Sequence, residues 1–146
     1  MGKCKSGQVF IHKLNILQKK AIRAITFSDY HAHTSPIFKE LNVLKIEDLF
    51  KYKVSSLMWD YDHNNLPNAL KALFKKTRDT HSYGTRSANA DKLDVERTNT
   101  TRYGINSFKV IGATILNKLK DCDYYKNAQS KSIFLKSHKE ALLSTY

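Results

Sequence analysis

The first residues of the chain, MGKCKSGQ, contain a pattern that could direct lipid attachment. The spacing Met-Gly-x-x-x-Ser is that of an N-myristoylation signal, with Gly2 as the acceptor and Ser6 at the required distance. Cys4 could take a second acyl chain, and Lys3 and Lys5 would suit an anionic lipid surface. Because so short a pattern is also met by chance, it gives a hypothesis of lipid anchoring.

Two histidines in one loop could contact a metal ion. His31 and His33 are separated by one residue, but a third and fourth ligand have no obvious source in the sequence. The sequence contains no glycine-rich phosphate loop and no Cys/His quartet with zinc spacing. We therefore predict no metal site and no cofactor.

Paired carboxylates are the remaining candidates for catalysis. Asp60 and Asp62 could bind a catalytic magnesium ion if they lay on a strand turn. At the end of a helix they point to different sides, so we expect both to face solvent, and we expect the same of Asp121 and Asp123. The histidines and serines have no spacing that supports a catalytic triad. We therefore expect that the protein is not an enzyme.

The net charge is the strongest compositional signal. Twenty-five Lys and Arg residues stand against 13 Asp and Glu residues, which gives a formal net charge of +12. Residues 1–30 carry a net charge of +5, residues 31–65 carry −1, and residues 104–146 carry +4. A neutral middle between basic flanks indicates a packed centre with basic surfaces for an anionic partner, although a surface selected for solubility can look the same.

Length and composition fit one small intracellular domain. The chain has 146 residues, of which 41% are hydrophobic, and no apolar run approaches the ~20 residues of a membrane span. Cys4 and Cys122 are too few for a disulfide framework, and no secretory signal is present. We expect a tail over 1–8 and a single domain over 9–146, in the nucleus or cytoplasm, and we do not expect association with a membrane.

Residues 9–26 show the pattern of an amphipathic helix. Its apolar residues, which we call the apolar stripe, are Phe10, Leu14, Leu17, Ala21, Ala24 and Ile25. Its basic residues, which we call the basic face, are Lys13, Lys19, Lys20 and Arg23, with Ile16 among them. We expect the apolar stripe to pack and the basic face to meet phosphates, although ordinary solvated lysines would give the same pattern.

Helical patterns recur in the rest of the chain. We predict helices at 36–42, 46–61, 68–76, 113–122 and 130–146. The apolar side of the second is expected to be Ile46, Leu49, Phe50, Val54, Leu57, Met58 and Tyr61, and that of the third Leu66, Leu70, Leu73 and Phe74. The fold class is therefore mainly α.

Residues 77–102 are polar and indicate a long loop, in which only Leu93 and Val95 are aliphatic anchors. The segment RYGINSFKVIG, residues 102–112, could form a strand because its apolar residues alternate. We therefore predict a short β element in the 82–111 region of an otherwise small helical domain.

A second basic and aromatic patch is suggested by the pieces YGTR and TRYG. Tyr83 and Arg86 belong to the first, and Arg102 and Tyr103 to the second. Aromatic rings stack on exposed bases while arginines hold phosphates, so these four residues are candidates for nucleic-acid contact. The alternative is that the tyrosines anchor the loop to the core.

Several segments taken together resemble a known family. The segment LNILQKKAIRAITFSDYHAHTSPIFKELNVLKIEDLFKYKVSSLM resembles a region of reverse transcriptases from non-LTR (LINE-type) retrotransposons, particularly jockey- and CR1-like elements. In that family the region lies just after the catalytic palm. Later segments of that region resemble NNLPNAL, HSYGTRSA and RYGINSFKVIGATILNKLK. The likeness covers roughly residues 12–143, with the pieces in the family's order.

The chain departs from the family pattern in three ways. Leu116 stands where the family has an aromatic residue, Lys120 stands where it has a proline, and the F/Y-A-D-D magnesium motif is absent. The resemblance therefore implies the thumb and C-terminal extension of an RNA-directed DNA polymerase without its catalytic centre. If the chain is a piece of a longer reading frame, Met1 is an accident of truncation, and the lipidation pattern has less weight.

The resemblance implies contact with a template–primer duplex, and the first helix matches the part of a thumb that tracks it. We therefore predict a non-catalytic module that binds RNA or DNA, as a duplex or a single strand. The alternatives are an interaction or structural remnant without a nucleic-acid role, and a lipid-anchored basic protein.

Overall fold

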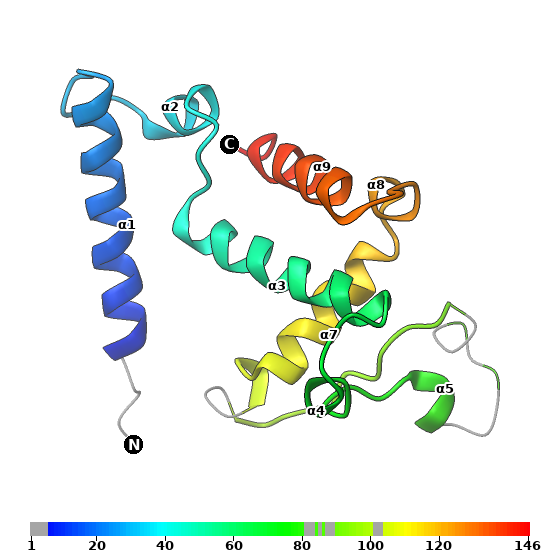
Figure 1. Cartoon of the computed structure of the whole chain (residues 1–146). Coiled ribbons are helices and arrows are strands. Elements are labelled where there is room, and N and C mark those ends of the chain that lie inside the picture. Colours follow the sequence, from blue (N-terminus) through cyan, green and yellow to red (C-terminus); the bar gives the residue numbers. More distant parts are fainter. Residues whose placement is uncertain (1–5, 81–83, 85, 87–89, 101–103) are drawn as a thin grey trace. The chain divides into compact units, whose positions relative to one another are not determined.

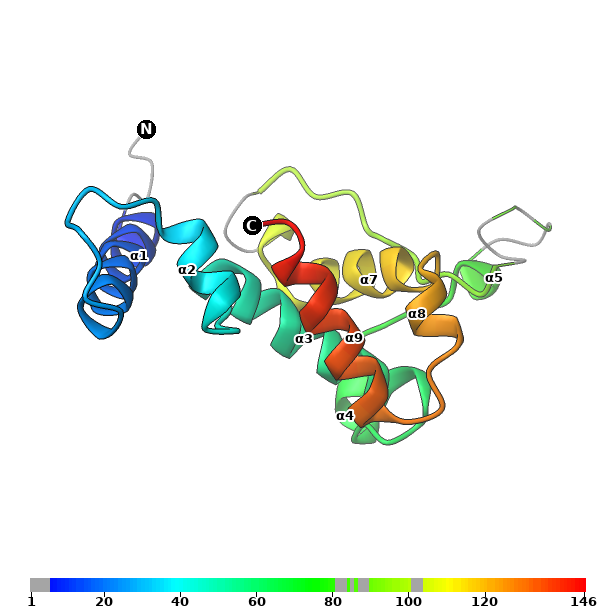
Figure 2. The ribbon, with the colours of Figure 1, turned by 90° about the horizontal axis from the view of Figure 1, so that it is seen from above.

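The computed structural model describes residues 6–80, 84, 86, 90–100 and 104–146 and is mainly helical, which confirms the predicted fold class (Figures 1 and 2). Its helices are α1 (Ser6–Ile25), α2 (Thr34–Glu40), α3 (Ile46–Asp62), α4 (Asn68–Lys71), α5 (Thr77–Thr80), α7 (Phe108–Leu119), α8 (Asp123–Lys126) and α9 (Lys131–Leu143). No helix in this described part of the chain is long and apolar enough to cross a membrane.

The single domain expected over 9–146 divides in the structure into two compact units. The first, which we call the terminal unit, comprises Met1–Phe50 and Lys136–Tyr146. The second, which we call the central unit, is Lys51–Leu135. The chain passes from one unit to the other within α3 and within α9. The helix α1 begins at Ser6, inside the predicted tail.

The terminal unit has a small core at the C-terminal end of α1. Ile22 of α1 is buried with Ile37 and Phe38 of α2, and Tyr146 packs against this cluster. The turn between α1 and α2 is closed by the Thr26 hydroxyl, which donates to the carbonyl of Ile22 over 3.0 Å. The amide of Thr26 donates to the same carbonyl over 3.1 Å, so Thr26 holds the end of α1 through two hydrogen bonds.

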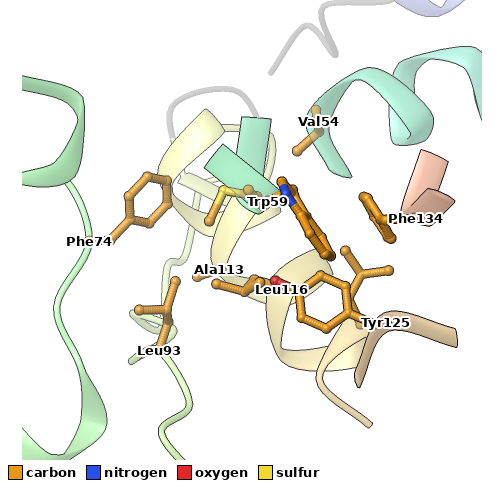
Figure 3. Close-up of a cluster of buried hydrophobic side chains, with 10 residues drawn as sticks. Val54, Trp59, Phe74, Leu93, Ala113, Leu116, Tyr125 and Phe134 are labelled. Atoms are coloured by element: carbon orange, nitrogen blue, oxygen red, sulfur yellow. The ribbon is translucent and has the colours of Figure 1, made fainter. Parts of the chain in front are cut away.

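The central unit has a larger aromatic core (Figure 3). The ring of Trp59 stacks on Phe134 with centroids 4.7 Å apart, and Tyr125 meets Trp59 edge-on at 5.2 Å. Gly112 lets α7 approach the residues around it, because a Cβ there would lie 2.9 Å from the sulfur of Met58 and 3.1 Å from the ring of Phe74. A side chain at position 112 would therefore displace buried groups.

The predicted strand at 102–112 is wrong over its described residues, 104–112, because none of them is in a strand. Phe108–Ile111 lie in the first turn of α7, and the Ser107 hydroxyl caps this helix by accepting from the amide of Val110. Four alternating residues cannot distinguish a strand from a helix start, and the apolar pattern continues at helical spacing to Leu119. In the described residues of the predicted β region, the extended pairing is the isolated antiparallel bridge between Lys76 and Leu93.

Several residues predicted to be inside are exposed. In α3, Val54 and Met58 are buried as expected, but Leu49, Phe50 and Leu57 are exposed. The core instead takes Trp59, which the sequence pattern did not place inside. Leu66 and Phe74 are buried, whereas the residues between them that were expected inside, Leu70 and Leu73, are exposed. The predicted helix over 68–76 is shorter in the structure, because α4 ends at Lys71. Residues after Lys71 therefore do not follow the helical spacing on which the expected apolar side was based.

Candidate nucleic-acid interface

The helix α1 contacts the rest of the terminal unit along a narrow strip of residues spaced three and four apart. Asn15 donates to the carboxylate of Glu47 over 3.0 Å, and the amide nitrogen of Gln18 donates to the carbonyl of Leu44 over 2.8 Å. The side-chain oxygen of Gln18 also accepts from the amide of Ile46. Ile22, only 4% exposed, completes the strip.

The apolar stripe of α1 does not pack within the described structure, so this part of the prediction is wrong. Phe10 is 65% exposed, Leu17 is 60% exposed and Ile25 is 65% exposed. At about 100° per residue, the stripe lies roughly a quarter turn around the helix from the Asn15–Gln18–Ile22 strip. The sequence pattern missed that strip because two of its three members are polar.

The basic face of α1 is largely open to solvent. Lys13, Lys19 and Lys20 are exposed, and no carboxylate of the described residues lies within 4.0 Å of their ammonium groups. Arg23 is half-buried, and its Nε donates to the carbonyl of Ala32 over 3.0 Å. The sequence of α1 contains no acidic residue, so the positive charge of this helix is not neutralised from within.

Cations of the central unit are in a different state, because many of them are paired. The ammonium group of Lys120 lies 3.0 Å from Asp62 and 3.3 Å from Asp91, and Lys76 lies 3.0 Å from Asp91. Further ion pairs join Arg78 to Asp91, Lys92 to Asp121, Lys109 to Glu96 and Lys131 to Asp60. Exposed lysines also occur in the central unit, so what distinguishes α1 is that three of them share one helix without an acidic residue.

The prediction that Asp60 and Asp62 face solvent is wrong. Their side chains are 21% and 25% exposed, and each is held by an ion pair. Asp62 also accepts a hydrogen bond of 2.8 Å from the hydroxyl of Tyr125. Burial and the neighbouring Asp62 carboxylate raise the pKa of Tyr125, so the hydroxyl keeps its proton and remains a donor. Asp121 and Asp123 are exposed, as expected.

Asp91 organises the polar loop of the central unit. Its φ of 50° lies in the left-handed region, which aspartate tolerates better than most residues. Burial alone would raise the pKa of Asp91, but hydrogen bonds from Lys76 and Lys120 outweigh burial and hold the pKa below its ordinary value. Of the two predicted anchors of this loop, Leu93 is buried and Val95 is exposed.

The second predicted patch is only partly described. Arg86 is exposed, whereas Tyr83, Arg102 and Tyr103 lie outside the described residues, as do Gly2 and Cys4 of the lipidation pattern. Whether Arg86 and the other three residues come together therefore stays a prediction.

The histidines of the first loop are exposed, and His31 meets the ring of Tyr30 edge-on at 5.2 Å. Among the residues that the structure describes, no three His, Cys, Asp or Glu side chains gather into a metal-binding group.

Neither the models of protein families, nor the curated proteins, nor the solved structures contain a match to the chain.

Proposed function

We propose that the protein binds nucleic acid without catalysing a reaction, and that the basic face of α1 supplies the main contacts. The observation that carries this proposal is the state of Lys13, Lys19 and Lys20. They are exposed, they lie on one helix without acidic residues, and no described carboxylate is within 4.0 Å of them. Such a helix attracts an anionic polymer whose charges repeat along its length.

The dimensions of α1 suit a phosphate backbone. A helix of 20 residues is about 30 Å long at 1.5 Å per residue, so its three free lysines can reach about three phosphates. Arg23 supports the helix end through its bond to Ala32 and is the least available of the predicted contacts. Lysine is a point charge without planar geometry, which favours backbone contact over recognition of particular bases.

The resemblance to LINE-type reverse transcriptases supports the same proposal. It implies a thumb-like module and C-terminal extension, separated from the polymerase centre. Since the sequence has no F/Y-A-D-D motif, we propose that the chain contacts RNA or DNA as a duplex or single strand and does not extend a primer.

The test is filter binding to single-stranded and duplex RNA and DNA over a range of salt concentrations. Binding through counterion release makes log K fall with log salt by roughly 0.7 to 0.9 per phosphate. We expect the triple variant Lys13→Gln, Lys19→Gln, Lys20→Gln to reduce that slope by about two to three units for all sequences, because it removes three phosphate contacts. The helix should remain folded, since glutamine has nearly the helix propensity of lysine.

A matched control removes the same charge elsewhere. Lys75, Lys118 and Lys126 are exposed lysines of the central unit, and replacing all three with glutamine should change the slope much less. Equal losses in the two triple variants would mean that diffuse net charge, not α1, drives binding. Absence of binding to all four probes would favour the interaction or structural remnant, and Gly2-dependent binding to vesicles would favour the lipid-anchored protein.

A further inference from the structure

A hollow of about 190 Å³ lies in the terminal unit beside α1. It is smaller than the ~300 Å³ of the smallest usual ligand pockets, so it suits a single ionic group better than a whole metabolite. Its lining includes Lys19, Thr34, Ser35, Phe38, Lys45 and Glu47. Lys19 is the one member of this lining that also belongs to the basic face.

Lys45 is held in place at this hollow by neutral groups. Its ammonium nitrogen donates to the Ser35 hydroxyl over 3.2 Å and lies 3.9 Å from the centre of the Tyr146 ring. No described carboxylate lies within 4.0 Å of it. The ring and the hydroxyl therefore fix the position of the cation without cancelling its charge.

Two further groups set the charge and donors of the hollow. Glu47 is its one carboxylate among the lining residues, and it accepts from Asn15 over 3.0 Å without an ion-pair partner in the described residues. The two lysines therefore exceed the carboxylate by one formal charge. Because the Ser35 oxygen accepts from Lys45, its own hydrogen is left to donate to a ligand.

We propose that this hollow binds a phosphate group of the nucleic-acid backbone, with Lys45 and Lys19 as the cations and Ser35 as a hydroxyl donor. This inference rests on the proposed function and adds a contact that the sequence did not indicate. Phosphate oxygens accept several hydrogen bonds at once, and charge-assisted bonds of this kind are the stronger ones. A cation already fixed by Tyr146 and Ser35 loses little freedom on binding.

The first test is the substitution Lys45→Gln, measured by salt-dependent filter binding to single-stranded RNA. We expect affinity to fall about threefold to tenfold and the salt slope to shrink by about one unit. The control Lys39→Gln removes the same charge from an exposed position on α2 that does not line the hollow, and it should change the slope much less. Lys45→Arg keeps the charge and should retain the slope, which separates charge loss from damage to the fold.

The second test uses a variant that should bind RNA more tightly, and a gain in affinity cannot result from misfolding. Glu47→Gln keeps an oxygen that accepts from Asn15 but removes the negative charge from the hollow. We expect it to bind RNA about twofold to fivefold more tightly. The control Glu40→Gln, at an exposed position on α2 that does not line the hollow, should gain less.

The outcomes separate this inference from the proposed function. If Lys45→Gln matches Lys39→Gln and Glu47→Gln matches Glu40→Gln, while the α1 triple variant still loses binding, the hollow is not a phosphate site and the proposed function stands. A third measurement follows the amide signals of Thr34 and Ser35 by NMR during titration with inorganic phosphate and then with RNA. A response to inorganic phosphate alone, in a protein that binds no nucleic acid, would overturn both proposals.

Discussion

The side chain of Asn117 pairs with the backbone of Leu93 through two hydrogen bonds of 2.8 Å. The amide of Leu93 donates to Oδ1 of Asn117, and Nδ2 of Asn117 donates to the carbonyl of Leu93. Leu93 also forms the isolated antiparallel bridge with Lys76. The backbone amide and carbonyl of Leu93 therefore bond to a side chain of α7, where a second strand would bond to them in a sheet. This pairing fixes the polar loop of the central unit on α7.

The first prediction follows from that pairing. Asn117→Ala leaves the amide and carbonyl of Leu93, a residue 3% exposed, without these partners. We expect a loss of about 2 to 3 kcal/mol in the free energy of unfolding, although alanine is the better helix former. Urea unfolding followed by the fluorescence of Trp59, the one tryptophan, measures this loss.

The control for Asn117 is Asn106→Ala, at an exposed position before α7. It should change stability by less than about 0.5 kcal/mol. Equal effects of the two substitutions would show that the Asn117–Leu93 pairing contributes nothing to stability.

The second prediction concerns Lys120, which is 15% exposed and bridges Asp62 and Asp91. Lys120→Met leaves both carboxylates without this partner, and we expect a loss of about 2 to 3 kcal/mol, below the range for fully buried pairs. Asp62→Asn keeps an oxygen that accepts from Tyr125 and removes one of the stranded charges. The double variant should therefore lose less than the two single losses added together.

Additive losses in that double-mutant cycle would mean that Lys120 and Asp62 do not interact in solution. Lys118→Met, at an exposed position on the same helix, controls for the introduction of methionine and should be nearly neutral.

The helices of the chain could be predicted from the sequence better than the faces that they bury. The period of apolar residues indicated α1 over 9–26, and the structure has it at Ser6–Ile25. That period fixes an angle around the helix axis but not the partner at that angle. The strip contains Asn15, which donates to the Glu47 carboxylate 32 residues away, and Gln18, which bonds to backbone groups 26 and 28 residues away.

In the candidate site, too, features set by local spacing could be predicted, and features set by distant residues could not. Exposure of Lys13, Lys19 and Lys20 followed from their spacing, because they lie together on one side of a single helix. Lys45 could not be found in this way, since Tyr146, whose ring it faces, lies 101 positions further along the chain. The burial of Asp62 was missed for a similar reason, because Tyr125, which donates to it, is 63 residues distant.

The third prediction compares the two sides of α1. Leu17 is exposed on the apolar stripe, so Leu17→Ala should change the free energy of unfolding by less than about 0.5 kcal/mol. Ile22 is buried against α2, and Ile22→Ala should cost about 2 to 3 kcal/mol. Urea unfolding followed by circular dichroism at the helix band makes the comparison. A cost at Leu17 as large as that at Ile22 would show that the stripe is covered in solution.

The last prediction concerns His138, a residue of α9 that is 7% exposed. Burial lowers the pKa of its imidazole, so the folded state resists protonation while the unfolded state accepts a proton at its ordinary pKa of about 6.5. The stability that the neutral, buried His138 contributes is present above the unfolded-state pKa and is lost as the pH falls below it. We expect the free energy of unfolding to decline between about pH 7 and pH 5, and His138→Gln to flatten the decline. His12→Gln, which removes an exposed histidine of α1, should leave the decline as in the wild type, and an equally steep decline in the His138 variant would contradict the assignment.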